Sequence, residues 1–497
     1  MGGGMHSRGR GADAPWLRRF AKGALGRLAR VLCGVGVWWL LVVWCVAGGM
    51  GLVFMRNVGA LSAPDPDLHV PTAYALATGQ SFARTVVVED VFGNRVRRPV
   101  IRGDDRYLTG LVAYNRTLTA ASADSLRRDQ DIDAQRRLLT REPLELQARP
   151  RATQYTPVAY LPQALGLRLA WARGSDPYTA LQYARLMNLA SYLLMAGIAV
   201  ALAPRGRPLL ALMTCLPASC YAASSVMTDG LFLAAVMLLV SLVMRAAERR
   251  ERMGIPTLTA ICMLSGFLIL GKALYASCLL LVVALPRSVL PRRRRTVFLA
   301  WCMACLTAYL WWTTNYSGGY YNAGQTANTA YMLAHPLRSF TLLAANMLFL
   351  PRTLLAPTVA SLGATLLVLA AWLHALNATR PRGTADGTGS RETIPQEDDP
   401  SHTGGHMPVD MHTAIAKVRA SASRDRYRIM AALAALAALA MIVGFVALTW
   451  NDLTTLDPAG AIQGIQGRYL LPLLPLLAST LTTHHDDTTP TRPRQKE

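Results

Sequence analysis

Residues 229–246 read Asp-Gly-Leu-Phe-Leu-Ala-Ala-Val-Met-Leu-Leu-Val-Ser-Leu-Val-Met-Arg-Ala, an apolar stretch with an acid at one end and the basic run Arg245–Arg252 at the other. A helix of this length approaches the roughly 20 residues that cross the apolar core of a bilayer. Lysine and arginine concentrate on the cytoplasmic side of membrane proteins, so we expect the basic end inside the cell and Asp229 outside. The stretch therefore predicts one membrane-spanning helix with a defined direction.

Similar apolar runs occur on both sides of this stretch, and every second connection between them is strongly basic. The basic turns are Arg205–Arg207, Arg245–Arg252 and Arg292–Arg295. Their alternation predicts an all-α polytopic integral membrane protein of the plasma membrane, with about ten spans and both termini in the cytoplasm. The expected spans are 31–54, 184–203, 208–226, 230–246, 255–271, 273–289, 296–313, one within 355–376, 429–450 and one that begins at Gly467.

The composition supports a membrane protein, because 52% of the 497 residues are hydrophobic and only 16% are charged. The net charge of +22 does not indicate a nucleic-acid partner, since the basic residues cluster beside apolar segments, as they do in cytoplasmic loops. The lipid bilayer is the expected partner. The cysteines lie in apolar segments, so we expect neither a disulfide framework nor a cysteine metal cluster.

The spans divide the chain into regions. Residues 1–30 form a basic cytoplasmic tail, and residues 31–376 form a membrane domain with a large outer loop at 56–183. Residues 377–428 are rich in glycine, threonine, proline and acids, which predicts a disordered cytoplasmic loop, and 429–497 hold the last two spans and a cytoplasmic tail. Smaller expected elements are a helix from Pro71 to Thr78 closed by Gly79, a strand from Thr85 to Val88, and an interfacial helix near 337–350.

An acidic cluster follows the first span, where the chain reads Pro64-Asp65-Pro66-Asp67-Leu68-His69. Proline favours an extended conformation in the residue before it, and alternate side chains of an extended segment face the same way. Asp65, Asp67 and His69 are therefore expected to converge on one point. A hydrated loop whose acids include a helix cap explains the same spacing.

Several motifs occur along the chain in a recognisable order. They are Asp65 to His69, Tyr155 to Gly166, Arg185 with Asn188, Ser225 to Asp229, Lys272 with Tyr275, and Gln466 to Pro472. In these motifs the chain resembles an uncharacterised family of bacterial multipass membrane proteins, domain of unknown function twenty-one forty-two. The chain departs from the family pattern at Pro66, which separates two acids where the family has an adjacent pair.

The layout of that family is similar to that of GT-C-type glycosyltransferases. The resemblance implies a GT-C-like fold and a membrane enzyme that transfers a sugar from a polyprenyl-phosphate donor to an extracytoplasmic cell-envelope acceptor. An acidic motif in a long first outer loop is typical of those enzymes, and the cluster at Asp65 occupies that position here.

This reaction assigns roles to the motif residues. A carboxylate can take the proton of the acceptor hydroxyl, and Asp65 is the first choice; Asp67 and His69 then orient the acceptor, or Asp65 and Asp67 share a divalent cation such as Mg or Mn. Lys272 and Arg468 are expected to stabilise the phosphate leaving group. The further expected substrate-binding residues are Tyr155, Tyr160, Gln163, Arg185, Asn188, Asp229, Gln466 and Tyr469.

Other interpretations remain open for the same residues. Lys272 and Arg468 are also consistent with side chains that reach from span ends to the membrane surface, and Asp229 with a hydrated turn. A membrane transporter or flippase for envelope lipids or glycans is the alternative function, and a non-catalytic scaffold for envelope assembly is the third.

Overall fold

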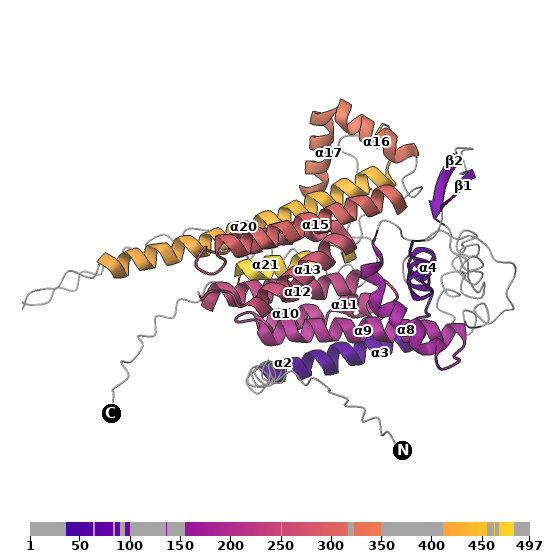
Figure 1. Ribbon diagram of the computed structural model, residues 1–497, viewed down its shortest axis with the longest axis horizontal. Coiled ribbons are helices and arrows are strands. Elements are labelled where there is room, and N and C mark those ends of the chain that lie inside the picture. The colour runs from indigo at the N-terminus through magenta and orange to yellow at the C-terminus, as the bar shows by residue number, and fades with distance from the viewer. Residues whose placement is uncertain are drawn as a thin grey trace, which may run out of the picture.

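The computed structural model of the chain describes residues 36–62, 65–82, 85–89, 95–99, 136, 155–249, 251–316, 323–348, 411–454, 462 and 467–481. Its long helices lie lengthwise beside one another in a bundle (Figure 1). The first is a continuous helical run made of α2 (Gly36–Val42), the π-helix η1 (Val43–Ala47) and α3 (Gly48–Asn57). The others are α9 (Pro177–Leu202), α12 (Asp229–Arg249), α13 (Ile255–Lys272), α15 (Arg292–Tyr316) and α20 (Met411–Trp450).

Six helical segments in the described part of the chain are long and apolar enough to cross a membrane. Backbone groups inside a bilayer must be hydrogen-bonded within the protein, which a helix achieves along its whole length. The polytopic membrane class predicted from the sequence is therefore confirmed, although the described spans are fewer than ten. They are Trp38–Asn57, Pro177–Leu202, Asp229–Arg249, Ile255–Ala284, Arg292–Tyr316 and Tyr427–Leu448.

The span predicted at 208–226 is wrong as a single helix. The chain there forms two short helices, α10 (Arg207–Thr214) and α11 (Pro217–Ala223). Proline has no N–H to donate to the preceding turn, so Pro217 begins a new helix rather than continuing the first. The span expected within 355–376 lies outside the described residues.

The helix α12 lies at the centre of the bundle, and most of its side chains are buried. The surrounding helices turn large apolar side chains outward instead, among them Trp38, Leu52, Met303 and Leu310, each more than half exposed. Such a surface is unfavourable in water but suits contact with lipid chains. The distribution of apolar residues thus agrees with a bundle embedded in a bilayer.

The chain turns back near Lys272, as predicted, so the segment Ile255–Ala284 runs in both directions; the span expected at 273–289 is wrong as a single α-helix. After α13 the chain continues as the 3-10 helix η3 (Ala273–Leu279) and α14 (Leu280–Ala284). The Met253 N–H donates to the Val289 carbonyl over 2.9 Å, so both ends of this segment meet and Lys272 lies near the turn between them. A Cβ on Gly271 would lie 2.6 Å from Phe232 Cζ, so only glycine allows the turn to pack this closely on α12.

The three basic turns form hydrogen bonds and an ion pair with adjacent segments at the end of the bundle opposite to Lys272. Arg205 forms an ion pair with Glu248, and Arg245 donates to the Leu202 carbonyl. Arg294 donates to the Met253 carbonyl, and Arg295 to that of Leu285. The bundle therefore has a basic end, whose cytoplasmic position stays a prediction of the positive-inside rule, and an opposite end that carries Lys272.

The long segment between the first run and α9 contributes small elements that gather at this opposite end (Figure 1). They are α4 (Pro66–Ala77), the antiparallel strands β1 (Thr85–Glu89) and β2 (Arg95–Pro99), the 3-10 helix η2 (Pro157–Tyr160) and α8 (Leu161–Trp171). The predicted strand and the closing Gly79, with φ of 77°, are confirmed. The predicted helix exists but begins earlier than expected, at Pro66.

The later part of the chain contains α16 (Ala323–Ala334) and α17 (Pro336–Leu348), which lie beside the bundle (Figure 1). The helix expected near 337–350 is thus confirmed as α17. The predicted disorder of 377–428 is wrong from Met411 onward, where α20 already begins. Extending an existing helix costs far less than starting one, so the apolar span carries its helix back into the polar sequence. Residues 377–410 and the tail 1–30 lie outside the described part.

The last expected span also differs from a simple helix. It begins with two 3-10 turns, η4 (Gly467–Tyr469) and η5 (Leu471–Leu473), and only then becomes α21 (Leu474–Leu481). Pro472 lies in the second of these turns, where its missing N–H interrupts regular helical bonding. The turns place Arg468 and Tyr469 at the end of the bundle that carries Lys272.

Candidate functional site

Four charged side chains form a continuous row, which we call the ion row. Arg468 Nη2 lies 2.7 Å from Asp65 Oδ2, and Arg468 Nε lies 3.3 Å from Asp229 Oδ2. The other oxygen of Asp229, Oδ1, accepts a 2.6 Å hydrogen bond from Lys272 Nζ. The exposed fraction of the side chain falls along the row, from 33% at Asp65 through 11% at Arg468 to 5% and 4% at Asp229 and Lys272.

The helix ends explain two members of the row. Asp229 is the first residue of α12 and Lys272 is the last residue of α13. The dipole of a helix favours negative charge at its N-terminus and positive charge at its C-terminus, so both charges lie where the backbone stabilises them. Arg468 lies between the two acids and neutralises both, which limits the cost of burying these charges.

Asp65 has an unusual backbone conformation, and the extended segment predicted there is wrong. Its φ of 54° lies in the left-handed region, and the helix α4 begins at the next residue, Pro66. Proline is well suited to the first helical position, and this start overrides the extended preference. The Asp65 carbonyl accepts bonds from the N–H groups of Leu68 and His69, but its carboxylate caps no N–H group.

The left-handed conformation costs a non-glycine residue on the order of 1–2 kcal/mol. Asp65 therefore sits in a strained backbone while its carboxylate faces Arg468 across the site. Strain of this kind is often found at functional positions. Asp67 is a helical residue of α4, and its side chain lies outside the described part, so its convergence with Asp65 stays a prediction.

His69 lies against the tyrosines of the Tyr155–Gly166 motif. Its Nδ1 shares a 2.6 Å hydrogen bond with the Tyr160 hydroxyl, and its ring stacks parallel to that of Tyr155. Burial lowers the pKa of His69 to about 4; Arg468 and Lys272 lower it too, whereas the two acids of the ion row raise it. The imidazole is therefore neutral at pH 7.

Aromatic rings cover the Lys272 end of the row. The Lys272 Nζ lies 4.7 Å from the centroid of the Tyr469 ring and less than 6 Å from three others. These distances lie within the range of cation–π attraction. The three other rings belong to Tyr155, Phe232 and Tyr275.

Two further contacts hold Tyr469 in place. The Tyr275 hydroxyl donates to the Tyr469 carbonyl over 3.0 Å, which ties η3 to η4. The Arg468 guanidinium also lies near the Tyr469 ring, with Cζ 5.2 Å from its centroid. The ring thus contacts both cations of the ion row.

A second buried group of polar residues supports the row without joining it. Gln163 donates to the Asn188 side chain over 2.9 Å, and Asn188 in turn donates to one carbonyl at the end of α11 and to two in the connection between α11 and α12. These carbonyls belong to Ala223, Ser225 and Met227. Arg185 donates to the Ser224 and Val58 carbonyls over 2.6 and 2.9 Å.

These contacts use main-chain partners, so we interpret Gln163, Arg185 and Asn188 as positioning residues. The connection that they hold leads directly to Asp229. It also presents Met227, whose sulfur accepts a 3.0 Å contact from Arg468 Nη1. Their predicted contact with substrate is not tested by the structure.

The structure thus gathers most of the predicted site residues at one end of the bundle. Asp65, His69, Tyr155, Tyr160, Asp229, Lys272, Arg468 and Tyr469 lie in one connected cluster. Gln466 lies outside the described residues. Met227 and Phe232 also contact the cluster, although they were not among the site residues expected from the sequence. They lie two residues before and three residues after Asp229, and this proximity was the signal in the sequence that could have identified them.

A cavity of about 70 Å³ adjoins the aromatic end of the row. Its polar wall carries Lys272 and the rings of Tyr155 and Tyr469, and the rest is mainly apolar. The remaining lining residues are Ala273, Leu274, Tyr309, Ile442, Phe445 and Val446.

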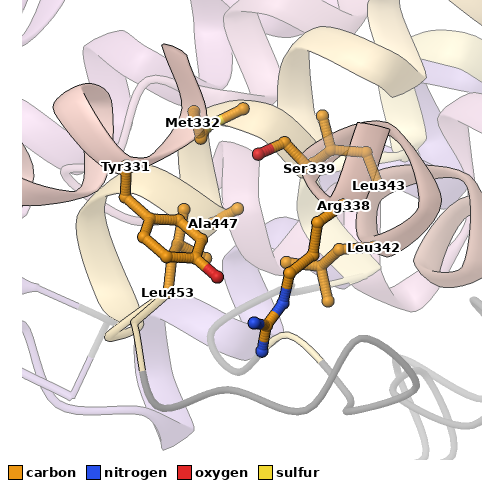
Figure 2. Close-up of a pocket in the computed structure, with 8 residues that line it drawn as sticks. All are labelled: Tyr331, Met332, Arg338, Ser339, Leu342, Leu343, Ala447 and Leu453. Carbon is orange, nitrogen blue, oxygen red and sulfur yellow. The ribbon is translucent and has the colours of Figure 1, made fainter. Parts of the chain in front are cut away.

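A second pocket, of about 10 Å³, lies between α16, α17 and α20. Figure 2 shows the side chains of Tyr331 and Arg338 on opposite walls of this pocket. A space of this size holds about one water molecule, so it is too small for a substrate.

The predicted metal site stays a prediction. No cluster of three or more metal-ligating side chains occurs among the described residues, which do not include the side chain of Asp67. The guanidinium 2.7 Å from Asp65 would repel a divalent cation unless Arg468 moved away. The described geometry therefore favours a site in which the protein's own cation, Arg468, neutralises Asp65.

The fold and this site define a polytopic integral membrane protein with a charged, aromatic-lined centre at one end of its bundle. Residues 48–375 match the family described as predicted membrane protein, DUF2142, and the chain belongs to this family. The resemblance stated from the motifs is thereby confirmed. The matched range includes Asp65, Asp229 and Lys272 but ends before Arg468. No curated protein and no solved structure gives a significant match to the chain.

Proposed function

We propose that the protein is a GT-C-like glycosyltransferase of the plasma membrane. It transfers a sugar from a polyprenyl-phosphate donor to an extracytoplasmic cell-envelope acceptor. The observation that supports this proposal most is the ion row, in which the partly exposed Asp65 carboxylate lies 2.7 Å from Arg468. A base for the acceptor and a cation for the leaving group are the two elements that the reaction requires.

In the proposed reaction the Asp65 carboxylate takes the proton of the acceptor hydroxyl. The hydroxyl oxygen forms a bond to the anomeric carbon of the donor sugar, and the bond from that carbon to the phosphate oxygen breaks. The electron pair of the broken bond leaves with polyprenyl phosphate. Arg468 and Lys272 stabilise the negative charge on this leaving group.

The exposure gradient along the ion row supports this division of roles. Asp65 is the most exposed member, so a water-soluble acceptor reaches it more easily than any other group in the row. Lys272 is almost fully buried and lies beside the apolar cavity, where a lipid phosphate is a more suitable partner than a soluble sugar. His69 and Tyr160 orient the acceptor at the start of α4.

The test is sugar transfer by the full-length protein in liposomes that contain a radiolabelled polyprenyl-phosphate sugar. The expected result is label in the envelope glycan fraction with the wild type and its near-complete loss with Asp65→Asn. Mass spectrometry of envelope glycans from cells with and without the gene identifies the sugar and the acceptor. Transfer at the wild-type rate by the Asp65→Asn protein would contradict the proposed role of this carboxylate.

A transporter or flippase remains the second candidate, because helices are interrupted within the bundle. Transporters often place such breaks at substrate sites. Here α10 and α11 are separated at Cys215 and Leu216, and the chain turns at Lys272 into a 3-10 helix. Lipid movement across liposomes without any covalent change to the lipid would favour this alternative.

A further inference from the structure

The cavity beside Lys272 has walls of two kinds. One wall is formed by the lysine and the tyrosine rings around it, whereas the other is formed by Leu274, by Tyr309 of α15 and by Ile442, Phe445 and Val446 of α20. The two helices pack mainly on different elements: α15 packs on α13, while α20 packs on η3 and α14. Both helices line the cavity, and their outer faces carry exposed apolar side chains.

The outer faces of both helices continue the apolar surface away from the cavity. Leu306 and Leu310 of α15 are 37% and 54% exposed, and Met441 of α20 is 36% exposed. These side chains meet lipid in a bilayer. An apolar chain that leaves the cavity toward the membrane would thus remain in contact with apolar side chains.

Lys272 gives the wall of the cavity a positive charge. Within the described residues its one hydrogen bond goes to Asp229 Oδ1, while aromatic rings lie around the rest of the ammonium group. An ammonium group has three N–H donors, so it can bind an anion from the cavity without leaving Asp229. A buried cation behind apolar walls matches a phosphate that carries a hydrocarbon chain.

We propose that this cavity binds the phosphate-proximal end of the lipid donor. The donor enters sideways from the bilayer, between α15 and α20, and its phosphate contacts Lys272, Tyr155 and Tyr469. The acceptor reaches Asp65 from the other side of Arg468, so the arginine separates a lipid compartment from an aqueous one. This inference rests on the proposed function for the identity of the lipid.

The volume of the cavity sets a limit on what it holds. By the measure in which roughly 10–15 Å³ holds one water molecule, about 70 Å³ holds several water-sized groups. The phosphate and the first carbons of the chain fill such a space, and the remainder of the chain lies outside, along the membrane-facing surfaces of α15 and α20.

Photocrosslinking tests this arrangement without requiring any transfer. A benzophenone amino acid replaces Phe445, which lines the cavity, in full-length protein reconstituted in phosphatidylcholine vesicles with labelled polyprenyl phosphate. The matched control carries it at Leu436, which is 54% exposed on the opposite face of the same helix. We expect several-fold more adduct at position 445 than at 436, and a loss of that excess in Lys272→Met.

Unlabelled competitors show whether the cavity selects polyprenyl phosphate, an ordinary phospholipid or the phosphate anion alone. Unlabelled polyprenyl phosphate should abolish the excess adduct, whereas the same amount of phosphatidylglycerol or inorganic phosphate should not. Equal adduct at both positions would overturn the assignment of the cavity. Full competition by phosphatidylglycerol would show a site for ordinary phospholipid, and competition by inorganic phosphate would show a site for the anion alone; both results contradict the proposal.

A cavity-filling variant gives an independent measurement. Ala273→Leu places added carbons in the cavity, and its matched control, Ala300→Leu, adds them to an exposed position on α15. The KM for the lipid donor should rise on the order of tenfold in the first variant only, with kcat unchanged. Crosslinking without sugar transfer would refute the proposed function but keep the lipid site, whereas transfer without preferential crosslinking would refute the lipid site alone.

Discussion

The Arg468 guanidinium donates to the Asp65 carboxylate over 2.7 Å, although 403 residues separate them in the sequence. The contact joins the segment after the first span to the beginning of the last described helical segment. It also brings Asp65 into line with Asp229 and Lys272, which lie on other helices. The candidate site therefore depends on the packing of the entire bundle.

The first prediction concerns Arg468. Arg468→Ala should lower donor affinity by roughly 10- to 100-fold, the effect of losing a hydrogen bond between charged groups. Arg468→Lys should restore it only partly, since an ammonium keeps the charge but not the planar fork that meets both acids. Titration calorimetry with purified protein measures both values, and Arg56→Ala, at an exposed position, serves as the control. Wild-type affinity in both variants would mean that Arg468 only anchors the chain at the membrane surface.

The second prediction separates binding from turnover at Asp65. General-base catalysis contributes on the order of 100- to 10,000-fold, so Asp65→Asn should lower kcat by that factor. Donor affinity should change little, because the proton moves mainly in the transition state. Steady-state kinetics measure both quantities, with Asp452→Asn at an exposed position as the control. A loss confined to donor affinity would assign Asp65 to binding.

The third prediction concerns metal use. Asp67→Asn should be milder than Asp65→Asn if Asp67 only orients the acceptor. The two variants should be equally inactive if both acids hold one Mg²⁺ or Mn²⁺ ion. Treatment with a chelator distinguishes these cases, because activity that disappears and returns with added metal supports the shared ion. Activity unaffected by chelation would remove the metal from the mechanism.

The fourth prediction tests the positioning role of Asn188. Asn188→Leu removes the side-chain amide that donates to the carbonyls of Ala223, Ser225 and Met227, which should lower the free energy of unfolding by roughly 1–3 kcal/mol. Thermal unfolding in detergent measures the loss. The control is Asn57→Ala, which removes one exposed side-chain bond to the Val53 carbonyl and should change stability by less than about 0.5 kcal/mol. Equal stability of both variants would argue against the proposed support.

The fifth prediction follows from the pKa of His69. Its folded pKa of about 4 lies below its ordinary value of 6.5, so between these values the unfolded chain binds a proton that the folded chain does not. Stability is therefore full above pH 6.5, falls as the pH is lowered to 4, and levels off below it. The free energy of unfolding should fall by about 3 kcal/mol across this range. The difference in unfolding free energy between wild type and His69→Gln, measured across this range, should show this slope; a constant difference would contradict the burial of a neutral imidazole.

The last prediction concerns orientation in the membrane. Cysteine placed at Val87, which is 60% exposed on β1, should react with a membrane-impermeant reagent added to intact cells. Cysteine placed at Glu251, an exposed residue after α12, should react only after the membrane is opened. The reason is that Glu251 belongs to a strongly basic turn, and such turns stay in the cytoplasm. Labelling of position 251 from outside would reverse the orientation and remove the site from the extracytoplasmic face.

The local sequence determined much of the fold. Apolar length and basic turns identified the membrane class and the turn at Lys272, because hydropathy and charge act within one segment. The same reasoning failed at Pro217, where one apolar run breaks into α10 and α11, and at Met411, where a helix extends into polar sequence. Both errors arise where backbone hydrogen bonding, rather than hydropathy, sets the limits of a helix.

The tertiary structure alone decided how the charges combine. The motifs indicated which side chains matter, but no spacing in the sequence showed that Arg468 lies between Asp65 and Asp229 or that Lys272 faces Tyr469. At Asp65 the sequence predicted an extended segment, whereas the structure shows a helix start with a left-handed residue before Pro66. Ion pairs and aromatic contacts depend on distances of a few ångströms between helices far apart in the chain, and only the packing of the bundle sets those distances.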